Sequence, residues 1–401
     1  MSKNTKIAVT IILSILFFVI GFLAGFVGYS IYKQKSLGTG DGSVQVSTQN
    51  NGTSSGESGG ENGGNSGSNG GVEDFGEIQI HFPELNSYYT GDCTIIKVGN
   101  TEVLIDAGAS GATSVYEKNV DHMDNYIKTV CTDGVLEYVV VTHAHRDHYA
   151  CFSYKGASGS LFNRYQIGTI IDFSQTNQST GAMYNNYLNE RQEAIDAGAT
   201  HYTAKELVDS NNTVFNLSSN VKLTVLNQKY YHQKQSTGEN DHSVCTLVSH
   251  GNNRHFLFTG DLELEGEESL AELNNLPEVE LFKAGHHGSK TSSNEVLLTE
   301  IKPKSVCVCC CAGTSEYTDT NANKFPTQEF INRVAPYTDK VYVTSQVDDD
   351  SAKTYKSMNG NILVKSKILG LEWTFSNNDK KLKDTVWFLE NRQMPSAWAT
   401  A

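Results

Sequence analysis

Residues 142–148 read Thr-His-Ala-His-Arg-Asp-His, so three imidazoles and one carboxylate lie within six positions. The run before them, Tyr138–Val141, is apolar and mostly β-branched and predicts a buried strand. A loop at the end of a strand can direct several side chains toward one point. Imidazole and carboxylate groups are good ligands for Zn²⁺ and similar divalent ions. The stretch therefore predicts a metal site, with room for two adjacent ions.

The alternative interpretation of this stretch is a solvated polar turn after a strand. That interpretation would be the better one for a single histidine. His143, His145, Asp147 and His148 together argue against it, because crowding or burying four titratable groups without a metal is costly.

Two later segments supply further candidate ligands. Asp261 follows the predicted strand His255–Thr259, and the pair His286-His287 follows the apolar segment that begins at Leu281. Either segment alone is weak evidence, but both lie downstream of the first cluster and both follow a strand. The sequence therefore predicts that all three segments contribute to one centre.

A further histidine is expected between the first cluster and Asp261. His242 lies just before the predicted strand Val244–Ser249 and is the preferred candidate. His232 is the competing candidate, and the sequence leaves both open.

The remaining pattern is that of an α/β protein. Strands are predicted at Ile78–Phe82, Thr94–Val98, Glu102–Asp106, Thr169–Phe173, Val221–Leu226, Ser305–Cys311 and Lys340–Thr344, in addition to those named above. Helices are predicted behind a capping box at Ser114–Glu117 and at Ala182–Ala197, Leu264–Asn274, Ser293–Glu300 and Thr327–Ala335.

The first 36 residues predict a membrane anchor. Ile7–Tyr32 is apolar apart from three hydroxyl residues, which is long enough to span a bilayer as a helix. It exceeds a signal-peptide core, and no small-residue cleavage site follows it. Two lysines flank each end, so the orientation signal is weak. Gly21 and Gly25 form a G-x-x-x-G that could pair two copies; ordinary glycine in a membrane helix is the alternative.

Residues 37–71 are rich in Gly, Ser and Asn and predict a disordered linker. Residues 72–401 then predict one folded domain of about 330 residues. We therefore expect a single-pass protein of the cell membrane, with this domain outside the cytoplasmic membrane. The 401-residue chain carries a net charge of −14, which argues against an extended nucleic-acid-binding surface.

The cysteines weigh against the external placement. The chain has 8, and Cys307, Cys309, Cys310 and Cys311 crowd into one predicted strand without the spacing of a disulfide framework or a thiolate metal site. Strand alternation puts Cys309 and Cys310 on opposite faces, so we expect buried, reduced thiols.

Together the motifs resemble those of the metallo-β-lactamase-fold hydrolases, close to the soluble domain of the DNA-uptake competence channel (ComEC type). The matching segments are Gly91-Asp92, Leu104–Gly108, His143–His148, Phe258–Asp261, Gly285–Ser292 and Phe325–Thr327. The chain departs from that channel in having one apolar span instead of many. It also carries His242 near a position where the competence proteins tend to have asparagine.

The resemblance implies a four-layer αβ/βα sandwich with two bound divalent ions, Zn²⁺ first and Mn²⁺ as the alternative. It implies that His143, His145 and His242 hold one ion, that Asp147, His148 and His287 hold the other, and that Asp261 bridges them. His287 is preferred over His286 as the ligand. Asp106 would orient a ligand histidine rather than touch metal.

The implied chemistry is hydrolysis by a hydroxide that bridges the two ions. Asp147 would orient the hydroxide, and His286 would protonate the leaving oxygen. Ser289, Lys290 and Thr291 would hold a phosphate at a helix start, with an ordinary helix cap as the alternative.

The leading functional hypothesis is a membrane-tethered phosphodiesterase that acts on nucleic acid, nucleotides or a wall polymer such as one bearing choline phosphate. A β-lactam or thioester hydrolase is the second hypothesis. The third is a non-catalytic, metal-stabilised binding module at the cell surface. Metal content together with a generic phosphodiesterase assay separates these classes.

Overall fold

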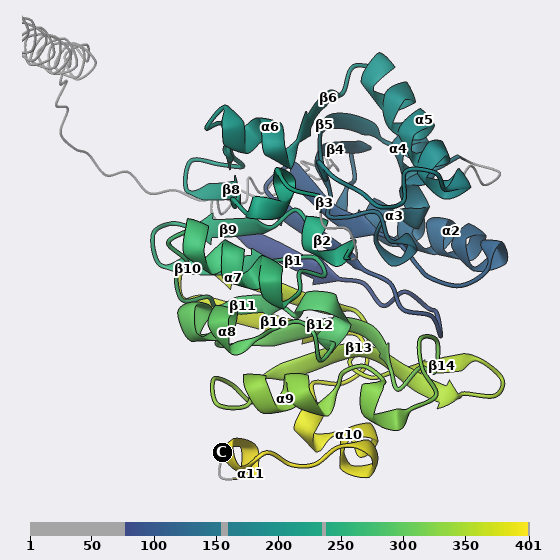
Figure 1. Ribbon diagram of the computed structural model, residues 1–401, viewed down its shortest axis with the longest axis vertical. Helices are drawn as coiled ribbons and strands as arrows, with labels where there is room; N and C mark the ends of the chain where they lie inside the picture. Colours follow the sequence, from purple (N-terminus) through teal and green to yellow (C-terminus); the bar gives the residue numbers. More distant parts are fainter. Residues whose placement is uncertain (1–76, 154–158, 235–237, 400–401) are drawn as a thin grey trace, which may run out of the picture. The chain divides into compact units, whose positions relative to one another are not determined.

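A computed structural model describes residues 77–153, 159–234 and 238–399, and it contains two eight-stranded sheets (Figure 1). The expected membrane helix with Gly21 and Gly25, and the expected linker at residues 37–71, lie outside the described residues. Within the described ranges, no helix is both long and apolar enough to cross a membrane.

The first sheet combines antiparallel and parallel strands. Its order is β16 (Gly370–Phe375), β15 (Ile362–Lys367), β1 (Ile78–Phe82), β2 (Cys93–Val98), β3 (Thr101–Ala107), β4 (Val135–Val141), β5 (Gln166–Asp172) and β6 (Thr200–Thr203). Strands β3 to β6 run parallel, so their C-terminal ends share one edge of the sheet.

The second sheet has a similar mixture. Its order is β14 (Thr354–Ser357), β13 (Val341–Asp349), β12 (Val306–Ala312), β11 (Leu281–Lys283), β10 (Arg254–Phe258), β9 (Thr246–His250), β8 (Val221–Val225) and β7 (Val214–Asn216). Strands β10 to β13 are parallel, and their C-terminal ends likewise share an edge.

The helices form two groups around the sheets (Figure 1). The first group is α2 (Thr113–Val130), α3 (Arg146–Ser153), α4 (Leu161–Arg164), α5 (Ala182–Asp196) and α6 (Ala204–Asp209). The second is α7 (Leu264–Leu273), α8 (Glu295–Ile301) and α9 (Gln328–Val334), followed near the C-terminus by α10 (Val386–Asn391) and α11 (Ser396–Ala399). Short 3₁₀ turns are η1 (Lys229–Tyr231), η2 (Asn240–His242), η3 (Gly285–Gly288), η4 (Asn321–Asn323) and η5 (Leu382–Asp384).

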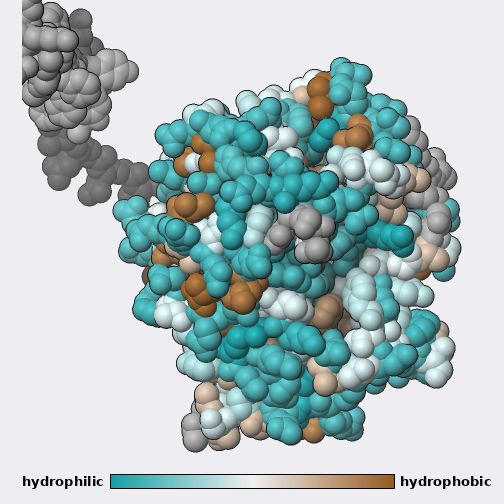
Figure 2. Space-filling view, in the orientation of Figure 1, coloured by the Kyte–Doolittle hydropathy of each residue, from teal (hydrophilic) through white to brown (hydrophobic). Residues whose placement is uncertain are grey.

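The core explains this layering. One cluster joins side chains of both sheets, such as Ile80 and Phe256, with those of α2 and α3, whereas a second cluster lies between the second sheet and α7 to α9. In β12, Cys307 and Cys309 belong to the first cluster and Cys310 to the second, as strand alternation predicts. The visible face is largely hydrophilic (Figure 2). Two large sheets in a mixed α/β arrangement are consistent with the expected fold.

Most predicted elements are confirmed within a few residues, and two local predictions are wrong. The cluster after β4 is not entirely a loop, because Asp147 and His148 lie in the first turn of α3. The capping box at Ser114–Glu117 does not cap α2; the helix begins one residue earlier, and Ala112 at its N-cap offers no side-chain hydrogen bond. The β15–β16 hairpin was not predicted, although β15 alternates buried and half-buried residues.

Candidate metal centre

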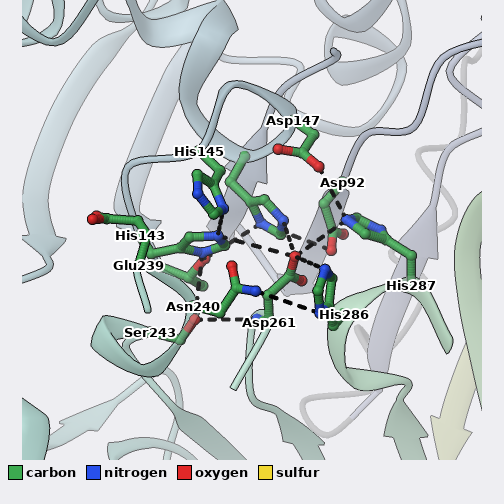
Figure 3. A network of polar contacts seen from close by, with 12 residues as sticks. Asp92, His143, His145, Asp147, Glu239, Asn240, Ser243, Asp261, His286 and His287 are labelled. Atoms are coloured by element: carbon green, nitrogen blue, oxygen red, sulfur yellow. Dashed lines mark hydrogen bonds and ion pairs between the residues drawn. The ribbon is translucent and has the colours of Figure 1, made fainter. Parts of the chain in front are cut away.

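The candidate residues converge where parallel strands of both sheets end (Figure 3). Asp106 lies near the end of β3, and the His143–His148 segment follows β4. Asp261 follows β10, and His286-His287 follows β11 in η3. The loops meet closely, since a Cβ on Gly108 would lie 2.3 Å from the backbone carbon of Asp147. Only glycine fits there.

Four side chains form the tightest group. Asp147, His148, Asp261 and His287 are all buried, and one ligand atom of each lies within 4.8 Å of the others. The Asp261 Oδ2 atom is 3.1 Å from His148 Nε2 and 3.4 Å from His287 Nε2. The Asp147 Oδ2 atom is 3.3 Å from His287 Nε2. This set of donors could hold a divalent ion.

Two oxygen atoms at Nδ1 orient the imidazole rings of this group. The Nδ1 atom of His148 lies 2.8 Å from Asp106 Oδ2, and that of His287 lies 2.8 Å from the carbonyl oxygen of Cys309. Each Nε2 atom therefore faces the carboxylates, and neither has a hydrogen-bond partner among the described residues. Histidine ligands are usually oriented in this way by a partner on the other ring nitrogen. The orphaned Nε2 atoms thus fit a bound metal.

Asp106 is itself held firmly. Its carboxylate accepts hydrogen bonds from the backbone N–H of Thr142 at 2.8 Å and from the Thr142 hydroxyl at 2.7 Å. Its φ of 56° lies in the left-handed region, which is unusual for a residue with a side chain. His286 and His287 have φ values of 46° and 54°. Such strained backbone persists where the surroundings fix it, as at functional sites.

The charged side chains within the group shift one another's pKa values. Burial alone would lower the pKa of His287, but the carboxylates of Asp261 and Asp147 raise it to about 10. Burial likewise opposes charge on His148, yet Asp261 and Asp106 raise its pKa well above the usual value. Against the opposite effect of burial, these imidazoles lower the pKa values of Asp147 and Asp261. The buried carboxylates therefore sit where a cation is favoured.

His143 and His145 form a second, smaller group. The Nε2 atom of His143 lies 3.1 Å from His145 Nδ1 and 4.0 Å from Asp261 Oδ2. Burial, together with the nearby His148 and His145, holds the pKa of His143 well below its usual value, which favours the neutral imidazole needed for metal binding. The ring of His143 lies beside that of His148, with centroids 4.2 Å apart.

His242 and His232 occupy different surroundings. His242 is fully buried in η2, and its Nδ1 atom lies 3.6 Å from Glu239 Oε2. Glu239 also accepts a hydrogen bond from the backbone N–H of Ala144, beside the histidine cluster. His232 is 35% exposed and lies 3.7 Å from the surface residue Asp209. The burial and the link through Glu239 favour His242, although its assignment as a ligand stays a prediction.

His286 differs from its neighbour His287. The side chain of His286 is 22% exposed and lines the cleft, whereas that of His287 is fully buried. His286 Nε2 lies 3.9 Å from Asp261 Oδ2, and its Nδ1 atom lies 3.1 Å from Glu263 Oε1. The exposed position of His286 suits a side chain that contacts substrate better than it suits a metal ligand.

The segment Ser289–Thr291 gives less support to its expected role. Lys290 Nζ lies 2.9 Å from Asn323 Oδ1, and the Thr291 hydroxyl donates to Glu263. The backbone N–H groups of Ser293 and Asn294 donate to the buried carboxylate of Glu267. Glu267 therefore occupies donors at the start of α8 that a phosphate would need, so phosphate binding by this segment stays a prediction.

Several neighbours of the centre were not singled out from the sequence. Ser243 links Asp261 to His143, because its hydroxyl accepts the Asp261 N–H at 3.1 Å and lies 3.3 Å from His143 Nδ1. Lys283 and Asp92 form a buried ion pair beside His148. The Tyr317 hydroxyl donates to Asp147 Oδ2 at 2.9 Å. Of these residues, only Asp92 and Lys283 could have been found from the sequence, because both lie within or beside segments that match the family's motifs.

A cleft of about 940 Å³ opens onto the group. Its walls include Tyr89, Tyr149, Met183 and Tyr317, and its lining also includes His145, Arg146, Asp147, Asp261, His286 and Glu316. The candidate ligands at its base are thus within reach of a bound small molecule or chain segment.

Comparison with known proteins gives short and partial similarities. No protein-family model matches the chain. Over 72 residues, 18% of its length, it is 39% identical to Recombination protein 2 of Haemophilus influenzae, covering 9% of that protein. Over 92 residues, 22% of its length, it is 38% identical to the competence protein ComA of Neisseria gonorrhoeae, covering 12% of that protein. The chain thus spans about a tenth of the length of these curated relatives.

Among solved structures, the metallo-β-lactamase-fold protein YhfI of Bacillus subtilis is similar, with a TM-score of 0.39 and 9% identity. That comparison covers 73% of this chain and 100% of the other. The chain is therefore similar to competence proteins over short stretches, which confirms that part of the resemblance expected from its motifs.

Proposed function

We propose that this chain is a metal-dependent hydrolase that uses two divalent ions to cleave a phosphodiester. The observation that carries the proposal is the buried convergence of Asp147, His148, Asp261 and His287 below an open cleft. Two buried Nε2 atoms without hydrogen-bond partners and two buried carboxylates form a donor set that a divalent cation would satisfy.

The ligand assignment follows the grouping of the side chains. One ion would be held by His143, His145 and His242, the other by Asp147, His148 and His287, with Asp261 between them. Zn²⁺ suits the imidazole-rich set, and Mn²⁺ is the alternative. Bound ions would supply water activation and stabilise negative charge on the attacked group.

The chain's own residues then have separate tasks. The Tyr317 hydroxyl and the His287 ring fix the carboxylate of Asp147, which can orient the attacking water. Glu263 fixes the Nδ1 side of His286, and the half-buried ring remains in the cleft wall. His286 can therefore deliver a proton to the leaving oxygen.

An anionic substrate is supported by the lining of the cleft. Arg146 lies at the cleft beside the centre and can pair with a phosphate oxygen. Ser289, Lys290 and Thr291 are proposed as a further contact. The net charge of −14 favours a nucleotide or a wall-linked phosphodiester over long nucleic acid.

We further propose that residues 1–36 anchor the protein in the cell membrane, that residues 37–71 form a tether, and that the hydrolase domain of residues 72–401 lies outside. All eight cysteines are buried and unpaired, which shields the thiols from oxidants and so weakens the objection that they raise to an external placement. A homodimer through Gly21 and Gly25 belongs to the same proposal.

The test uses the purified full chain, loaded with Zn²⁺ or Mn²⁺ and supplied with a generic phosphodiester, a β-lactam and a thioester. The proposal expects metal-dependent cleavage of the phosphodiester, lost in Asp261→Asn and kept in the surface variant Asp209→Asn. Preferred cleavage of the β-lactam or thioester would replace the substrate class. Full metal content without any turnover would instead support a binding module.

A further inference from the structure

The tip of the β15–β16 hairpin exposes two adjacent large apolar side chains. Ile368 is 76% exposed and Leu369 is 99% exposed, more than any other large hydrophobic residue in the described ranges. Scattered apolar residues are common on protein surfaces. Two consecutive ones at a projecting turn are less easily explained, because the hairpin needs neither of them for its own packing.

The tip is a tight turn that is hydrogen-bonded to the rest of the domain. Lys367 pairs with Gly370 across the hairpin, which leaves Ile368 and Leu369 as the two turn residues. The Arg254 guanidinium donates to the carbonyl oxygens of Lys367 and Ile368, the second at 2.7 Å. The second sheet therefore holds the base of the tip and fixes the direction in which it projects.

The strand registers place the tip at one particular edge of the molecule. Ile78, where the described chain begins β1, pairs with both Ser366 and Val98. Thr101 pairs with Val98 at the start of β3, whereas Ala107 at its end pairs with Cys93, beside the candidate centre. The tip and the first described residues therefore share one edge of this sheet, and the cleft lies at the opposite edge.

We propose that Ile368 and Leu369 insert into the surface of a lipid bilayer and so hold the cleft facing away from the membrane. This inference rests on the proposed membrane anchor. Two turn residues are too few for a specific protein interface, which buries roughly 800 Å² per partner. Lipid imposes no such requirement of shape. The tether also raises the effective concentration of the tip at the membrane, so a weak affinity suffices.

The contact is apolar in character. Lys365 and Lys367 lie near the base of the tip, but Glu77 accepts ion pairs from both lysines, and Glu372 accepts another from Lys367. Their charges are thus largely offset, and salt should weaken the contact little. With this edge on the lipid, the cleft admits soluble or wall-linked substrates in preference to lipid headgroups.

The test places a fluorescent probe at the tip of the full chain in vesicles of phosphatidylethanolamine and phosphatidylglycerol. Because all eight native thiols are buried, Leu369→Cys offers an accessible thiol for labelling. The matched control is Leu389→Cys, which is 63% exposed on α10. Trp387 of that helix lies against Gly313, just beyond the end of β12 and therefore at the cleft edge.

Spin-labelled lipid should quench the probe at position 369 several-fold more than the probe at position 389, at low and high salt alike. Adding Ile368→Asp to the labelled tip should remove most of this difference. Equal quenching in chains that float with the vesicles overturns the lipid contact and leaves the anchor intact. Chains that neither float nor show quenching overturn both the contact and the anchor.

Discussion

The two groups of candidate ligands differ in how firmly the fold holds them. His148 and His287 are each fixed at Nδ1, by Asp106 and by the Cys309 carbonyl, and both rings face Asp261. Within the described residues, His143 has only the neutral hydroxyls of Thr142 and Ser243 at its Nδ1 atom. Its Nε2 atom lies 3.1 Å from Nδ1 of His145, which is only partly buried at the cleft. His242 reaches the region through Glu239.

The group around His148 and His287 is the preorganised part of the centre. The orienting partners of the first group come from β3 and β12, so both sheets set its geometry. The second group depends on one segment after β4 and on a short 3₁₀ turn. We therefore expect the first group to bind its ion more tightly, since less order remains to be imposed on binding.

Asp261 joins the two groups, so its loss should have the largest effect. Asp261→Asn should lower phosphodiester turnover by more than about 100-fold, beyond the 10–100-fold typical of residues that only orient a ligand. Metal titration should show both affinities weakened. Asp209→Asn, a surface carboxylate, is the control. Near-normal turnover with full metal content in Asp261→Asn would contradict the bridging role.

Variants of the adjacent His286 and His287 distinguish the proposed metal ligand from the residue that lines the cleft. His287→Ala should lose metal affinity, because its buried Nε2 atom faces two carboxylates. His286→Ala should keep the metal and lose turnover, because its ring is 22% exposed in the cleft wall. Equilibrium dialysis combined with single-turnover rates distinguishes the two outcomes. The reverse pattern would exchange the two roles.

Variants of His242 and His232 test whether the second group of candidate ligands is assigned correctly. His242→Ala should weaken one class of metal site and leave the other near its normal affinity. His232→Ala should change neither, because this residue lies at the surface beside Asp209. Isothermal titration with Zn²⁺ resolves the classes. A loss of affinity in His232→Ala alone would reverse the choice.

Asp106→Asn should have the smallest effect of these changes. Asparagine keeps the shape but removes the charge beside His148 Nδ1. We expect a loss of about 10–100-fold in metal affinity, confined to the tighter class. If the looser class weakens instead, Asp106 does not act through His148.

Local patterns in the sequence predicted much of this centre. A β-branched run before the His143–His148 cluster marked the strand end, and the candidate segments of Asp261 and His286-His287 also followed a strand. The sequence could not show which partners orient the rings, because the Cys309 carbonyl and the Glu239 carboxylate reach the site only through long-range packing. The sequence also did not show that α3 begins at Arg146, since the residue before it is not of a usual helix-capping type.

The loop Ser289–Thr291 shows how a distant residue bears on a local prediction that is still untested. Its hydroxyls and lysine, together with the preceding Gly288, resemble a phosphate-binding turn, but Glu267, contributed by α7, accepts hydrogen bonds from the backbone N–H groups of Ser293 and Asn294. A distant carboxylate of this kind cannot be recognised from the spacing of the loop itself.

We propose that the centre holds two divalent ions and uses them for hydrolysis. The most direct measurement is the metal content of the purified full chain after loading with Zn²⁺ or Mn²⁺, taken together with its phosphodiesterase rate. We expect two ions per chain and a rate that disappears with chelation and returns on reloading. A chain that binds no ion after loading, or that hydrolyses at the same rate without one, would contradict it.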